Sequence, residues 1–457
     1  MKNNHNIPKT QKALVLQGGG ALGAYEVGVI NTLVEKLESE RAKDESDLPL
    51  FDIIAGTSIG AINAAVFVSN IVNRKKTWKE AALELEKFWT DEEYGLSSNP
   101  DFSNWWVKDE NLQNQTTASE EGLRKYYSVK EYFMHGIPRV CTPPLIRHLD
   151  KKFGDQRDNL WLHRSIQPLE NTIMRHSKSN DENDAEDSSK KFMISTSWEK
   201  KQPRLLVCAV DVSEGNTVTF DSYYREEEFK DPLYQSNGIT IDHVMASGTI
   251  PVFYDFRIID KRQFCDGGLL SNTPFRELLK AHQEYWLKKI EDDDNLKIPD
   301  LEVYIVNLHP PTGSLIKEDD HDGVRDRIND IIFSDRNSRY DENAFSIATD
   351  CFAIIEKLKS LAESNMSKDQ VDTFRHDLEK FLSTTKAKSN FGMGKTNNYK
   401  NVLNGMFKLT KVIRIQNHNN DYADSIYAKA ADFTKKSIKD LIKKGREDSK
   451  FLLDGRG

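Results

Sequence analysis

Apolar residues along this chain follow two alternating patterns. Short continuous apolar runs, typical of buried strands, are followed by stretches in which aliphatic residues recur every three or four positions, as on one face of a helix. The runs that predict strands lie at residues 13–17, 53–55, 204–212, 263–266 and 301–308. This alternation indicates an α/β fold with helices packed on a sheet of buried strands.

Beyond residue 312 the pattern becomes mainly helical. Apolar residues recur at helical spacing over 324–333 and 344–361, a strand is predicted at 411–415, and an amphipathic helix over 431–445 ends at a glycine. The stretch from about 77 to 202 is irregular, with few core signals. We therefore expect an α/β domain over residues 8–312 that carries this insertion, and a mainly helical C-terminal extension over residues 313–457 packed on the core.

The composition indicates a soluble globular protein. Of 457 residues, 38% are hydrophobic and 30% are charged, and the net charge of -8 provides no basic field, so no nucleic-acid partner is expected. Four widely spaced cysteines form no CxxC pair and predict neither a disulfide framework nor a metal site. The first ten residues lack the apolar segment of a secretory signal, so we expect a cytoplasmic protein.

Ser58 stands between the predicted strand at 53–55 and a helical stretch that begins near residue 61. The surrounding residues, from Gly56 to Gly60, have the Gly-x-Ser-x-Gly spacing of a sharp strand-to-helix turn, in which the two glycines crowd each other. Such a turn lifts the hydroxyl above the sheet at a helix N-terminus, where unpaired amides favour developing negative charge. Ser58 is therefore a candidate nucleophile, although the same spacing also occurs in structural turns.

A glycine run follows the first predicted strand and precedes a helical pattern. Without side chains, Gly18, Gly19 and Gly20 can turn their amides toward one point at the helix N-terminus. The run up to Gly23 also satisfies the Gly-x-Gly-x-x-Gly fingerprint, but a dinucleotide site needs an acidic residue at the end of the second strand, where this chain has Gly-Thr-Ser. An oxyanion hole, a dinucleotide-binding module and a structural turn remain open at this point.

Asp266 ends the predicted strand at 263–266, and Gly267 and Gly268 follow it. Because ligands of α/β sheets bind at the carboxyl ends of strands, this acid is well placed to reach Ser58. An aspartate can serve as the base if burial raises its basicity. A second hypothesis gives that role to His309, which follows the strand at 301–308, in a Ser-Asp-His arrangement.

Together these stretches resemble the patatin-like phospholipase family. The resemblance rests on Gly-Gly-Gly-Ala-Leu-Gly at 18–23, Gly-Thr-Ser-Ile-Gly at 56–60, Asp-Gly-Gly at 266–268, and Ala246-Ser247 followed by Pro251, and it covers roughly residues 12–310. It implies a three-layer α/β/α sandwich with a mostly parallel sheet. It also implies a lipid acyl hydrolase that needs no cofactor, with Ser58 as nucleophile, Asp266 as base, and the amides of the glycine run as oxyanion hole.

Two features raise the question of membrane contact. Trp105 and Trp106 fit either a buried cluster or an interfacial patch. Residues 395–457 carry 14 Lys and Arg against 7 Asp and Glu, which is typical of a solvated helix docked on the core and also suits anionic lipid. We therefore expect a lipid ester substrate and keep peripheral membrane contact through either feature as an open alternative, while the sequence leaves the oligomeric state undetermined.

Overall fold

The computed structural model describes most of the chain. The described residues are 7–41, 48–98, 118–143, 164–177, 192–223, 238–251, 253–290, 297–312, 321–385, 398–400, 405–417 and 429–455. Trp105 and Trp106 lie outside them, so their surroundings stay a prediction.

Eight strands of the described residues form one mixed, mostly parallel sheet. Its order is β10-β9-β1-β2-β4-β8-β7, with β5 paired to β4. The strands are β1 (Thr10–Leu16), β2 (Ile53–Thr57), β4 (Arg204–Asp211), β5 (Asn216–Asp221), β7 (Arg257–Ile259), β8 (Arg262–Asp266), β9 (Asp300–Asn307) and β10 (Leu409–Gln416). Buried aliphatic residues fill β2 and β4, which pair in parallel, as expected for strands covered on both faces.

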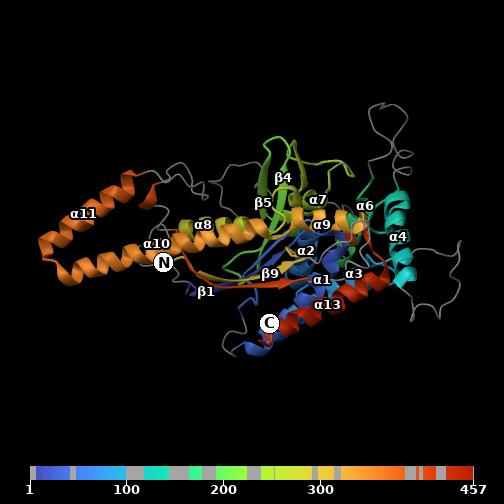
Figure 1. Ribbon diagram of the computed structural model, residues 1–457, viewed down its shortest axis with the longest axis horizontal. Coiled ribbons are helices and arrows are strands. Elements are labelled where there is room, and N and C mark those ends of the chain that lie inside the picture. The colour runs from blue at the N-terminus through green and yellow to red at the C-terminus, as the bar shows by residue number, and fades with distance from the viewer. Residues whose placement is uncertain are drawn as a thin grey trace. The chain divides into compact units, whose positions relative to one another are not determined.

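Helices flank this sheet, which confirms the predicted three-layer α/β/α fold (Figure 1). The helices of the described residues are α1 (Ala24–Glu40), α2 (Ile59–Val72), α3 (Trp78–Thr90), α4 (Ala118–His135), α6 (Gln167–Ser177), α7 (Ile241–Gly248), α8 (Phe275–Ile290), α9 (His321–Phe333), α10 (Arg336–Asn365), α11 (Lys368–Thr384) and α13 (Lys435–Leu453). Short elements complete the set: η1 (Gly20–Gly23), η7 (Gly267–Leu269), η9 (Lys429–Ala431) and a ribbon of β3 (Met193–Ile194) with β6 (Ile239–Thr240). None of the helices within the described residues has both the length and the apolar character to cross a bilayer.

The chain divides into two compact units, and the expected domains over residues 8–312 and 313–457 stay a prediction. The larger unit comprises residues 14–274, 304–335 and 414–457, and the smaller one comprises 1–13, 275–303 and 336–413. The C-terminal helix α13 therefore belongs to the unit that also contains Ser58 and Asp266. Within the smaller unit, α8 and α10 are joined by the ion pair between Arg276 and Asp341 at 2.6 Å.

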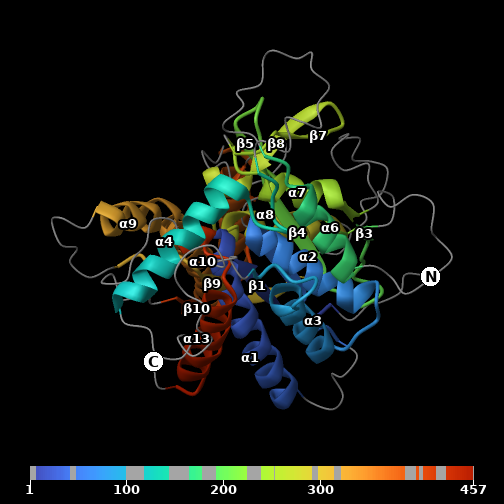
Figure 2. The ribbon, with the colours of Figure 1, turned by 90° about the vertical axis from the view of Figure 1, so that its right-hand side faces the viewer.

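The predicted C-terminal amphipathic helix is present as α13, but Gly445 does not end it. The helix continues to Leu453 and lies beside α1 (Figure 2). A Cβ on Gly445 would overlap the carbonyl oxygen of Tyr25, and a Cβ on Gly28 would overlap that of Ile442. The glycine in this helix thus allows two helix backbones to approach closely, a function that sequence cannot distinguish from a C-cap without the partner helix.

Candidate active site

Ser58 occupies the turn between β2 and α2 in a conformation that few side chains adopt. Its φ of 55° and ψ of -125° place a non-glycine residue at positive φ, which costs on the order of 1–3 kcal/mol and persists only where neighbouring contacts impose it. One of those contacts is the Ser58 amide, which donates to the Ser247 hydroxyl at 2.8 Å. That hydroxyl donates in turn to the carbonyl oxygen of Cys208 at 2.5 Å, so α7 and β4 hold the turn in place.

The glycines around this turn lie at close contacts, as the motif spacing predicts. A Cβ on Gly56 would lie 2.5 Å from the carbonyl carbon of Gly60, and a Cβ on Gly60 would lie 2.5 Å from the carbonyl oxygen of Leu16. Crowding of the same kind occurs at Gly23 against Ile59 and at Gly267 against the Cys208 carbonyl. These positions allow the serine turn, the end of β1 and the end of β8 to converge.

The Ser58 hydroxyl donates to Asp266 at the end of β8. Its Oγ lies 2.6 Å from Oδ2 of Asp266, and the other carboxylate oxygen, Oδ1, accepts the Gly268 amide at 2.7 Å. Both side chains are buried. The two residues, 208 positions apart in the sequence, therefore form one hydrogen-bonded pair.

Asp266 is close to Ser58 for a different reason than the one expected from parallel strands, because β8 is antiparallel to β4. Asp266 is aligned with Ala209 and Phe264 with Asp211, whereas Thr57 is aligned with Cys208 through the parallel pairing of β2 and β4. The strand β8 therefore enters at the carboxyl end of β4 and ends beside Cys208 and Ala209, at nearly the level of Thr57. Asp266 reaches the serine because its strand runs the other way and is short.

Burial makes Asp266 a stronger base than an ordinary aspartate. Removal from water raises the pKa of its carboxyl to about 6, although the hydrogen bonds from Ser58 and Gly268 act in the opposite direction. The carboxylate is thus ionised near neutral pH and is able to accept a proton there.

The glycine run lies next to Ser58, but its three amides are not equivalent. The Gly18 amide donates to the carbonyl oxygen of Asn272 at 3.1 Å, and the Asn272 side chain donates back to the Gly18 carbonyl oxygen at 3.1 Å. Among the residues that the structure describes, the amides of Gly19 and Gly20 have no such acceptor. Two of the three predicted donors therefore have no acceptor within the described part of the chain.

Gln17, which the sequence reasoning did not single out, connects the glycine run to the surrounding elements. Its Oε1 accepts the amides of Leu308 and His309 at 2.6 and 3.0 Å, and its Nε2 donates to Thr273 at 2.7 Å and to the Phe333 carbonyl oxygen at 3.1 Å. Its position at the end of a buried apolar strand could have indicated this role, because a buried polar side chain needs hydrogen-bond partners. Asn272, which also donates to Phe333, carried no such signal.

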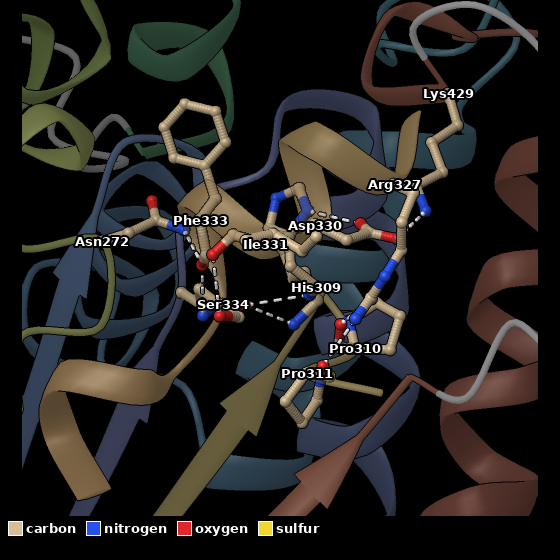
Figure 3. A network of polar contacts seen from close by, with 12 residues as sticks. Asn272, His309, Pro310, Pro311, Arg327, Asp330, Ile331, Phe333, Ser334 and Lys429 are labelled. Carbon is tan, nitrogen blue, oxygen red and sulfur yellow. Dashed lines mark hydrogen bonds and ion pairs between the residues drawn. The ribbon is translucent and has the colours of Figure 1, made fainter. Parts of the chain in front are cut away.

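His309 lies near the glycine run but is paired with a different carboxylate. Its Nδ1 lies 3.0 Å from Oδ1 of Asp330 in α9, and the ammonium of Lys429 lies 2.9 Å from the other oxygen of the same carboxylate (Figure 3). Burial opposes ionisation of Asp330, but the hydrogen bond from His309 and the charge of Lys429 outweigh it and lower the pKa of Asp330. The structure thus places His309 in a second polar network rather than within hydrogen-bonding contact of Ser58.

The space beside Gly20 bears on the dinucleotide hypothesis. A Cβ on this residue, which has a φ of 57°, would overlap the carbonyl oxygen of Ala430 in η9. A segment of the chain itself therefore lies against the glycine run. In addition, β2 ends at Thr57 and is followed by Ser58, whereas a dinucleotide site needs an acidic residue there to hold the ribose.

A serine at positive φ between a parallel strand and a helix is the arrangement of a nucleophile turn, so the fold and the site define the class of α/β proteins that carry such a turn. A family model described as Patatin-like phospholipase matches residues 14–279, which is more than half of the chain. The protein therefore belongs to the patatin-like phospholipase family, and this membership supports a lipid hydrolase function.

Individual relatives match over shorter stretches. The chain is 40% identical over 91 residues to patatin-like phospholipase domain-containing protein 7 of Rattus norvegicus and 38% identical over 91 residues to its counterpart in Mus musculus. Each match covers 19% of this chain and only 6% of the relative. The crystal structure of VipD from Legionella pneumophila matches with a TM-score of 0.33 and 14% identity, covering 98% of this chain and 67% of that one, which is too low a similarity to extend the comparison.

Proposed function

We propose that this protein is a serine acyl hydrolase that cleaves lipid esters, of the phospholipase A or esterase type, through Ser58 and Asp266. The observation that carries the proposal is the 2.6 Å hydrogen bond between the Ser58 hydroxyl and a buried carboxylate whose pKa is raised to about 6. A hydroxyl needs a base within hydrogen-bond reach to become a nucleophile, and Asp266 is such a base without the help of an imidazole.

In the first half of the reaction, Asp266 accepts the hydroxyl proton while the Ser58 oxygen attacks the ester carbonyl carbon. The tetrahedral intermediate carries its negative charge on the former carbonyl oxygen. Collapse of the intermediate breaks the bond to the leaving alcohol, which takes the proton from Asp266. An acyl ester on Ser58 remains.

In the second half, Asp266 accepts a proton from water, which attacks the acyl ester. The bond between the acyl carbon and the Ser58 oxygen then breaks, and the proton held by Asp266 returns to that oxygen. The fatty acid leaves and the free serine is restored. A single carboxylate thus serves as base and acid in both halves, which a pKa near 6 suits.

The oxyanion in this proposal is stabilised by the amides of Gly19 and Gly20. Gly18 was also predicted as an oxyanion donor, but we assign it a different role because its amide donates to the carbonyl oxygen of Asn272. A Cβ on Gly18 would lie 3.0 Å from the Cβ of Ser58, so this glycine allows the run to approach the nucleophile. Removal of one oxyanion donor typically costs about 100- to 1,000-fold in turnover.

The test is release of fatty acid from phosphatidylcholine and from a soluble short-chain ester. The wild-type protein should hydrolyse both, and Ser58→Ala should reduce turnover by roughly 10⁴-fold or more, since the nucleophile of a serine hydrolase has no substitute. A matched control is Ser69→Ala, because Ser69 is a buried serine later in α2 whose hydroxyl donates only to its own helix. Equal activity of the wild-type and Ser58→Ala proteins would refute the proposal.

A further inference from the structure

The helix α9 buries its acidic residues and exposes its aliphatic ones. Its acidic residues Asp326 and Asp330 are 1% and 0% exposed, whereas its aliphatic residues are exposed by 41% at Val324, 49% at Ile328, 42% at Ile331 and 64% at Ile332. A surface helix normally buries its apolar side and leaves its charged side in water. The four aliphatic residues, which we call the α9 face, therefore require another explanation than core packing.

The buried side of α9 accounts for its orientation. Asp330 forms the pair with His309 and Lys429, and Arg327 donates to the carbonyl oxygens of Pro310 and Pro311 at 2.9 and 2.7 Å. Figure 3 shows these side chains meeting on one side of the helix. These polar contacts fix the rotation of α9 about its axis, and the α9 face is directed outward as a consequence.

The α9 face is connected to the candidate active site through the end of the helix. The carbonyl oxygen of Phe333 accepts a hydrogen bond from Asn272 at 2.9 Å, and the same Asn272 side chain donates to Gly18, next to Ser58. A second exposed apolar pair lies close to the site in sequence. Leu269 and Leu270, exposed by 56% and 48%, come three and four residues after Asp266.

The chemistry of this surface suits lipid better than a protein partner. Protein interfaces are enriched in aromatic residues and arginine, and their energetic centres are poor in Leu and Val. The α9 face and the leucine pair consist of aliphatic side chains, which favour the acyl region of a lipid layer. An enzyme whose substrate is a membrane lipid also needs contact with the surface that contains it.

We propose that the α9 face, together with Leu269 and Leu270, is the surface by which the protein inserts into a lipid layer. This inference rests on the proposed lipid-hydrolase function and adds the way in which the enzyme reaches its substrate. It differs from the two earlier candidates for membrane contact. Because the inserted side chains are uncharged, binding should not require anionic lipid and should change little with salt.

The test compares two double variants in a Ser58→Ala background, in which binding is measured without hydrolysis. Ile328→Gln/Ile332→Gln removes half of the α9 face while keeping charge and helix propensity. Ile347→Gln/Ile354→Gln is the matched control, because these isoleucines of α10 are exposed by 64% and 59% and lie in the other unit. The probe is sedimentation with phosphatidylcholine vesicles at low and high salt.

We expect the α9 variant to bind vesicles about 100-fold more weakly, at roughly tenfold for each aliphatic side chain removed from the lipid layer, and the α10 variant to bind like its parent. With Ser58 restored, the α9 variant should hydrolyse vesicle lipid poorly and a soluble short-chain ester normally. Unchanged vesicle binding, or equal loss in both variants, would overturn the inference. The inference would also be overturned if the wild-type protein is a dimer that dissociates in the α9 variant, because the α9 face would then be a contact between copies. Absence of soluble-ester hydrolysis in the wild-type protein would instead refute the proposed function.

Discussion

Two buried aspartates of the larger unit behave in opposite ways. Asp266 accepts hydrogen bonds from a hydroxyl and an amide, both neutral, so that burial raises its pKa to about 6. Asp330 is also buried but is bonded to His309 and Lys429, and these partners lower its pKa despite burial. The charge of the partners separates a carboxylate that can accept a proton from one that holds a helix in place.

The largest effect is expected when the first aspartate is neutralised. Asp266→Asn should reduce ester hydrolysis by about 10³-fold or more, because an amide cannot accept the serine proton. Turnover of a soluble ester at pH 8 measures this directly. Retention of most of the activity would show that Asp266 is not the base.

The same variant should also be more stable at high pH, which distinguishes loss of a base from misfolding. The folded state raises the pKa of Asp266 to about 6, so ionisation above that pH costs it at most ~3 kcal/mol relative to the unfolded chain. Asparagine avoids this cost. Thermal unfolding at pH 8 should therefore show a higher Tm for Asp266→Asn, and the difference should vanish as the pH falls toward 4.

The second aspartate should show the opposite stability effect. Asp330→Asn leaves Lys429 and His309 without their carboxylate and should destabilise the protein by about 3 kcal/mol at pH 7, roughly 100-fold in the folding equilibrium. Because the pKa of Asp330 is lowered in the folded state, this contribution is present above the ordinary aspartate pKa and is lost as the pH falls through the folded value. Chemical denaturation of the wild-type and Asp330→Asn proteins at pH 7 and pH 3 measures the stability difference at each pH. A more stable variant at pH 7 would contradict this prediction.

A smaller effect is expected on the pH dependence of the wild-type enzyme. Since the base must be ionised, kcat/KM for a soluble ester should fall about tenfold for each pH unit below an apparent pKa near 6. If the same fall in kcat/KM occurs in His309→Ala, the titrating group is the aspartate. If the fall in kcat/KM at low pH disappears in that variant, the titrating group is the histidine.

The smallest effect on activity is expected from His309→Ala itself. The imidazole contacts Asp330 and lies near Gly19, so its loss should lower stability while turnover stays within about tenfold of the wild type. A loss of 10³-fold or more with retained fold would favour the Ser-Asp-His arrangement that the sequence left open.

Sequence was informative where a local motif determines the geometry. The crowding of Gly56 against Gly60 follows from five consecutive residues, whereas the positive φ of Ser58 is also held by Ser247 of α7. The direction of β8 did not follow from a local motif, because it depends on antiparallel pairing with β4, far earlier in the chain. The β7–β8 turn at Asp260 and Lys261 has positive φ at both residues, without the glycine that usually marks such a turn.

Sequence was less informative about which side of an element is buried. Apolar spacing over 324–333 correctly predicted the helix α9, but the same spacing is compatible with an apolar face turned outward. The orientation depends on the partners of Asp330, which are 21 and 99 residues away, and on the contacts of Arg327. Gly445 was misinterpreted for the same reason, because its function depends on a helix more than 400 residues earlier in the chain.

The most direct test of the central claim is the rate at which a fluorophosphonate labels Ser58 at pH 8, followed by intact mass and peptide mapping in the wild-type, Asp266→Asn and His309→Ala proteins. We expect one adduct on Ser58, formed at a similar rate in the wild-type and His309→Ala proteins and about 10³-fold more slowly in Asp266→Asn. Rapid labelling of Asp266→Asn together with slow labelling of His309→Ala would contradict it.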